Sequence, residues 1–167
     1  MISTSRLEWL VDVLARETGT SLDGWDIEIT RFHFDGAIRH GLGVRNLLIS
    51  SNLTSARPAR AVYTALHELT HVRQVNAGRL ACDPSDPVER IFWEGASVPN
   101  IAPSAEADEA RFRAYGSQPW EREATVAALS HPRSMGLPSD DWYCVMTVRM
   151  YIEWTGLDPV DNPWFMG

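Results

Sequence analysis

The pattern of apolar and polar residues in the first part of the chain predicts one helix followed by two strands. Apolar residues recur at helical spacing from Ser5 to Glu17. Apolar and polar residues alternate from Trp25 to Phe34. The apolar residues change from odd-numbered to even-numbered positions midway, which indicates a strand with a bulge or bend. The segment from Gly43 to Asn52 is a second strand, either internal or at a sheet edge that pairs with an extended peptide.

The rest of the chain is predicted to be mainly helical. A helix should begin near Pro58 and end near Gly78. The segment from Arg79 to Pro103 is punctuated by Pro, Asp and Gly, so we expect it to be largely irregular. Further helices are predicted over Ser104–Tyr115, Gly116–Leu129 and Ser139–Trp154.

Composition narrows the class of protein. A length of 167 residues with 44% hydrophobic content suits a single domain over residues 1–167, of mixed α+β class. The net charge of −7 argues against a nucleic-acid partner. No apolar stretch is long enough to span a bilayer, and Glu8 and Asp12 interrupt the N-terminal segment, so we expect no signal peptide and no membrane partner. The expected compartment is the cytoplasm, and Cys82 and Cys144 do not form a disulfide framework.

The strongest chemical signal lies inside the helix after Pro58. His67-Glu68-Leu-Thr-His71 is a His-Glu-x-x-His motif, and residues four apart stand above one another on a helix, so both imidazoles can reach one zinc ion. Glu68 then lies beside the metal, where it can take a proton from a water on the zinc. The alternative is a chance match on an ordinary amphipathic helix.

A zinc ion held by two histidines needs another protein ligand and keeps its fourth position open for water. Metzincins carry a Gly three residues and a third His six residues after the second His. Those positions are Gln74 and Ala77 here, so that class is excluded. The remaining option is a carboxylate from a second helix.

Two segments resemble the gluzincin metallopeptidases, especially their small bacterial and phage domains. These are His67-Glu-Leu-Thr-His-Val-x-Gln74 and the later Pro119-Trp-Glu-x-Glu-Ala124. The resemblance implies that Glu121 is the third zinc ligand, with Glu123 as the competing residue. Where the family has Asp or Asn after the Ala, this chain has Thr125. A carboxylate that supports a ligand histidine would then have to come from elsewhere, with Asp108 and Asp141 as the candidates.

Tyr115 is either a hydrogen-bond donor to a developing oxyanion or a packed aromatic residue at a helix start. The other histidines, His33, His40 and His131, have no ligand-like spacing and are expected at the surface or in the core.

Together, these observations and the resemblance imply a minimal zincin-like α+β fold, with a small sheet, an active-site helix and a helical C-terminal half. The expected function is that of a zinc metalloendopeptidase with one zinc ion, which hydrolyses peptide bonds of a protein or peptide substrate. Glu68 activates the water, and His67, His71 and Glu121 hold the metal. The alternative is a zinc-stabilised structural or binding module, such as a phage or injection-particle component, without peptidase activity.

Overall fold

The computed structural model describes residues 3–41, 43–55, 57–83, 90–102, 108–134 and 137–157. These residues form a mixed α+β structure. The helices are α1 (Thr4–Thr18), η1 (Ser51–Thr54, a short 3₁₀ turn), α2 (Pro58–Asn76), α3 (Glu109–Gly116), α4 (Pro119–Leu129) and α5 (Trp142–Thr155). The strands are β1 (Asp26–Thr30), β2 (Gly36–Gly41), β3 (Val44–Ser50), β4 (Leu80–Cys82), β5 (Arg90–Trp93) and β6 (Ala96–Pro99).

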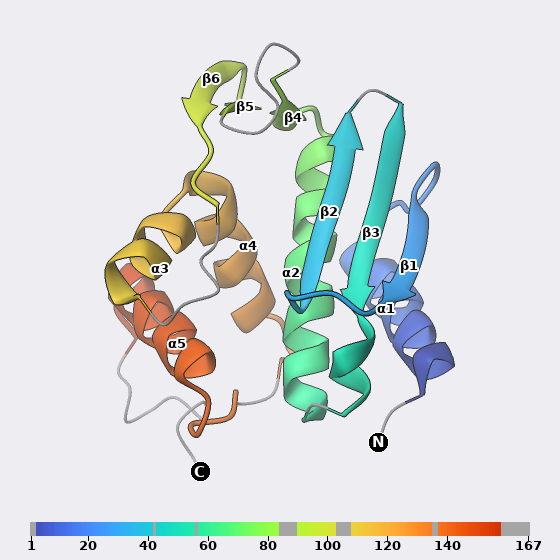
Figure 1. Cartoon of the computed structure of the whole chain (residues 1–167), viewed down its shortest axis with the longest axis vertical. Helices are drawn as coiled ribbons and strands as arrows, with labels where there is room; N and C mark the ends of the chain where they lie inside the picture. Colours follow the sequence, from blue (N-terminus) through green and yellow to red (C-terminus); the bar gives the residue numbers. More distant parts are fainter. Residues whose placement is uncertain are drawn as a thin grey trace.

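The first sheet has the strand order β1-β3-β2. β3 runs parallel to β1 and antiparallel to β2, with Ile38 opposite Leu47. The predicted strand over Gly43–Asn52 is therefore internal, and β2 is an edge strand. Figure 1 shows this sheet lying along α1 and α2, while α3, α4 and α5 gather on the other side of α2. Helix α2 thus separates the sheet from the helical second half.

The main core lies where α1 and α2 pack beneath the first sheet. Leu14, Leu47 and Leu69 have no exposed surface there, and Ala128 of α4 joins the same cluster. A second cluster joins α4 to α5 through Leu129 and Val148. Small residues on α4 allow this helix to approach α2 closely, because Ala124 and Ala128 are both fully buried.

The prediction of an irregular segment from Arg79 to Pro103 is wrong for the part that the structure describes. β4, β5 and β6 form a second, antiparallel sheet in chain order. Its strands are three or four residues long, too short to show a periodic pattern. Leu80 and Ile91 of this sheet pack with Trp120 at the start of α4. The second sheet therefore covers one end of the α2–α4 pair.

Three other expectations need correction. The strand predicted over Trp25–Phe34 ends at Thr30, and a further strand, β2, begins at Gly36. The helix predicted over Ser104–Tyr115 begins at Glu109 within the described residues; residues 104–107 lie outside them. Helix α5 begins after Asp141, whose carboxylate accepts hydrogen bonds from the amides of Tyr143 and Cys144.

None of the described helices combines the length and the apolar character needed to cross a bilayer. Cys82 and Cys144 are both free thiols.

Candidate metal centre

His67 and His71 lie one turn apart on α2 and point to the same place. Their Nε2 atoms are 3.1 Å apart, and the two rings meet edge to face. Helix α2 starts with Pro58 at its first position, where the missing N–H is not needed. Its motif-bearing face turns away from the main core and towards α4, so the histidines lie between the two helices.

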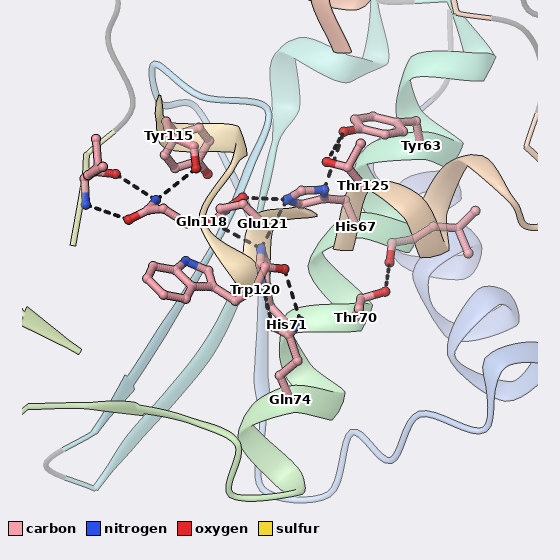
Figure 2. A network of polar contacts seen from close by, with 12 residues as sticks. Tyr63, His67, Thr70, His71, Gln74, Tyr115, Gln118, Trp120, Glu121 and Thr125 are labelled. Carbon is pink, nitrogen blue, oxygen red and sulfur yellow. Dashed lines mark hydrogen bonds and ion pairs between the residues drawn. The ribbon is translucent and has the colours of Figure 1, made fainter. Parts of the chain in front are cut away.

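Glu121 reaches the same point from the first turn of α4. Its Oε2 lies 3.2 Å from Nε2 of His67, and its Oε1 lies 3.5 Å from Nε2 of His71. Figure 2 shows the carboxylate directed at the two imidazoles. A carboxylate in the first turn of a helix also interacts favourably with the positive end of the helix dipole. The side chain is only 8% exposed.

Glu123, the competing residue, lies elsewhere. It forms two 2.8 Å hydrogen bonds with the guanidinium of Arg79, and its side chain is 37% exposed. Arg79 also pairs with Glu94 and lies over the ring of Trp93. Glu123 thus joins the second sheet to α4, and Glu121 is the carboxylate that the structure brings to the histidines.

The protonation of His71 can be assigned from its neighbours. The amide of Gln74 donates from Nε2 to the backbone oxygen of Trp120 at 3.1 Å, so its Oε1 must face Nδ1 of His71 at 2.8 Å. Nδ1 of His71 therefore carries a proton. In the neutral imidazole, Nε2 then presents a lone pair to the same point as the carboxylate of Glu121.

This donor set fits a metal ion. His67, His71 and Glu121 offer ligand atoms that all lie within 4.8 Å of one another. A tetrahedral zinc with ligand bonds of about 2.0–2.1 Å separates its ligand atoms by about 3.3–3.4 Å, and the three separations here are 3.1, 3.2 and 3.5 Å. Lone pairs that converge this closely repel unless a cation or a proton lies between them.

The electrostatics of the cluster point the same way. Burial alone lowers the pKa of His71, but the charge of Glu121 and its hydrogen bond outweigh that effect and raise the pKa to about 9. Burial alone raises the pKa of the Glu121 carboxyl, but His71 and His67 hold it well below its ordinary value. In the metal-free chain, a proton on His71 therefore supplies the positive charge that the cluster requires.

Glu68 lies beside this cluster and is buried. Burial raises the pKa of its carboxyl, and the two histidines partly offset the rise. The backbone of Gly36 passes so close to this side chain that a Cβ on Gly36 would lie 2.6 Å from Cγ of Glu68. The first residue of β2 therefore confines the carboxylate.

A cleft of about 710 Å³ opens onto the cluster. Its walls come from β2 on one side and from α3, α4 and α5 on the other, and Tyr115 lines it. Burial raises the pKa of Tyr115 well above its ordinary value, and the charge of Glu121 adds to the rise. Gln118 fixes the junction between α3 and α4, because its amide bonds the backbone of Ile101 and of Tyr115.

The structure departs from the sequence prediction in how His67 and His71 are supported. Asp108 caps α3, and Asp141 caps α5 and pairs with Arg60. Neither forms a described bond to His67 or His71. The partners are Gln74 for His71 and Tyr63 for His67. Gln74 lies three residues after His71, and Tyr63 lies four residues before His67. Side chains at these spacings lie on the same face of a helix, so the spacing could have identified both partners from the sequence.

Of the remaining histidines, His33 is exposed at the surface, as expected, and His40 is half-buried. Both line the cleft. Burial lowers the pKa of His40, and the neighbouring His71 and Arg45 lower it further. His131 follows the end of α4 and lines a separate, smaller hollow.

Comparison of the chain with protein-family models, with curated proteins and with solved structures finds no match.

Proposed function

We propose that this protein is a zinc-dependent metallopeptidase with a minimal zincin-like arrangement, which hydrolyses peptide bonds of a protein partner. The observation that carries the proposal is the convergence of His67, His71 and Glu121 from two helices at separations that suit one tetrahedral zinc. Three protein ligands leave one position for water, as in catalytic zinc sites. A purely structural site would be closed by a fourth protein ligand, and none lies in this cluster among the described residues.

When bound, zinc would supply a lowered pKa for a water molecule and would polarise the carbonyl group to be cut. The chain's own residues do the rest. Glu68 takes a proton from the water and passes it to the leaving amine. Tyr115 lines the same cleft and would donate its hydroxyl proton in a hydrogen bond to the oxygen that becomes negative.

The edge of β2 supports a peptide as the substrate. The amide of Ser50 donates to the backbone oxygen of Asp35 at 2.8 Å, so this pair is a hydrogen-bonded pair of the antiparallel ladder. By alternation, the backbone N–H and C=O groups of Gly36, Ile38 and His40 point outward from β2. These three residues line the cleft, and no strand among the described residues pairs with that edge. An extended peptide can add there as a further strand.

The first test is the zinc content of protein purified without chelator, measured by elemental analysis. We expect about one zinc per parent chain, a loss of zinc in Glu121→Ala and retention in the matched control Glu123→Ala. A parent chain that neither contains zinc nor takes it up would refute the proposal. Loss of zinc in Glu123→Ala alone would refute the assignment of the third ligand.

The second test separates the peptidase from a zinc-stabilised structural or binding module. Zinc-loaded protein is incubated with broad peptide libraries, beside Glu68→Gln, which keeps the metal ligands and removes the base. We expect hydrolysis by the parent and none by Glu68→Gln at equal zinc content. No hydrolysis by either protein would favour the structural module.

A further inference from the structure

The outer nitrogen of His67 faces the hydroxyl group of Tyr63, which in turn contacts the hydroxyl group of Thr125. Oη of Tyr63 lies 3.5 Å from Nδ1 of His67 and 3.4 Å from Oγ1 of Thr125 (Figure 2). Tyr63 lies one turn before His67 on α2, and Thr125 lies one turn after Glu121 on α4. The two hydroxyls therefore come from the same two helices that carry the metal ligands, and they meet beside His67.

The direction of the hydrogen bonds follows from the role of His67. Its Nε2 faces His71 and Glu121, so a ligand lone pair there requires the proton to be on Nδ1. Nδ1–H then donates to Oη of Tyr63, and the phenol proton donates to Oγ1 of Thr125. A phenol is protonated at neutral pH, so the series of donors has one direction.

We propose that Tyr63 and Thr125 are positioning residues that hold His67 in its metal-binding tautomer and orientation, Thr125 acting through Tyr63. The inference rests on the proposed metal site. Position 125 is where the resemblance to gluzincins leads one to expect Asp or Asn, and the hydroxyl pair takes over the support that such a side chain would give. His71 is supported by the neutral amide of Gln74, and Glu121 is the carboxylate that forms ion pairs with both histidines.

The test is the zinc affinity of a variant set, measured by competition with a chromophoric chelator at one pH. Loss of an outer partner of a ligand histidine costs about 10- to 100-fold in metal affinity. Because both distances are longer than those of typical hydrogen bonds, we expect Tyr63→Phe to weaken zinc binding by only about tenfold. Thr125→Val should weaken it by less, and the double variant should bind no more weakly than Tyr63→Phe, since the two groups act in series.

Two controls match these changes. Tyr151→Phe removes a buried phenol that bonds Ser130 away from the cluster, and Thr70→Val removes a buried hydroxyl of α2 that bonds the backbone of Leu66. Both should keep the parent's zinc affinity within about twofold. Thr125→Ser, which keeps the hydroxyl, should restore the affinity lost in Thr125→Val.

A spectroscopic readout distinguishes positioning from general loosening of the fold. In cobalt-substituted protein, the visible absorption bands report the geometry of the ligands. They should shift in Tyr63→Phe and Thr125→Val and stay unchanged in the two controls. Should Tyr63→Phe fail to fold, Thr125→Val carries the test, because valine has nearly the same shape as threonine.

The outcomes separate this inference from the proposed function. Tyr63→Phe and Thr125→Val with the affinity and cobalt spectrum of the parent would overturn the inference and leave the metal site standing. Additive losses in the double variant would overturn the series arrangement. A parent chain that binds no zinc would overturn both.

Discussion

Gly36→Ala should disable catalysis without removing the metal. Gly36 lies against the proposed base, and a Cβ there would be 2.6 Å from Cγ and 2.8 Å from Oε1 of Glu68. It would also lie 2.8 Å from Cγ2 of Thr64. Ordinary carbon–carbon contacts are about 3.5–4.0 Å. Because Glu68 is buried and cannot swing into solvent, its carboxylate must shift by about 1 Å or the start of β2 must move.

The magnitude follows from this displacement. A misplacement of about 1 Å in a reacting group costs on the order of 10²-fold in rate, so we expect kcat for peptide hydrolysis to fall by about a hundredfold. Overpacking should lower the free energy of unfolding by about 1–3 kcal/mol. The zinc content should stay at the level of the parent, because Glu68 is not a member of the ligand cluster.

The assay compares kcat, zinc content and urea unfolding for the parent and two glycine variants. Gly24 has a φ of +75°, and nothing lies within 4 Å of the place that a Cβ would take, so Gly24→Ala strains the backbone without touching the cleft. This control should lose about 1–2 kcal/mol of stability and keep its kcat. Parent-like kcat in Gly36→Ala would refute the reasoning, and so would an equal loss of kcat in Gly24→Ala.

Four further predictions concern other residues. Gln74→Leu removes the acceptor for Nδ1 of His71. This change should weaken zinc binding by up to about 100-fold, measured by competition with a chelator. Unchanged zinc affinity would contradict the tautomer assigned to His71. Zinc must displace the proton of His71, whose pKa is about 9 when no metal is bound. The apparent zinc affinity should therefore rise about tenfold per pH unit between about pH 6.5 and 8.5. An affinity that does not change with pH would contradict this prediction. Because this folded-state pKa exceeds the unfolded value, the metal-free chain should also lose stability as the pH rises from about 6.5 through 9, measured by urea unfolding. Leu69→Ala, at a fully buried position of α2, should cost about 2–5 kcal/mol of unfolding free energy, whereas Trp9→Ala at the exposed face of α1 should cost less than about 0.5 kcal/mol.

The helices could be predicted because their patterns are long. Helix α2 spans 19 residues between Pro58 and the turn at Gly78, and α1 spans 15 residues. The strands of the second sheet could not, since β4, β5 and β6 are too short for alternation to be visible. β2 was missed for another reason. Its sequence Gly-Ala-Ile-Arg-His-Gly has one β-branched residue and a glycine at each end, which suggests a loop.

The cluster of His67, His71 and Glu121 could be predicted only in part from the sequence. The spacing of His67 and His71 is local, so helix geometry alone brings them together. Glu121 meets them across 54 positions of sequence, and the choice between Glu121 and Glu123 depends on how α4 rotates against α2. The ion pair between Glu123 and Arg79 helps to set that rotation, and it requires the second sheet, which the pattern did not predict. Tyr115 lines the cleft, and its catalytic role stays a prediction.

The position of the cluster between the two halves of the fold determines which experiment is decisive. Glu68, His71, Gln74 and Glu121 are buried polar side chains between α2 and α4, and burying such groups is costly unless their charges are balanced. Metal bound by both helices would therefore stabilise the fold whether or not it also takes part in catalysis. Unfolding after zinc removal is expected from a peptidase and from a structural module alike, so it cannot separate them. Glu68→Gln can, because it keeps all three ligand side chains and changes only the group that would move the proton.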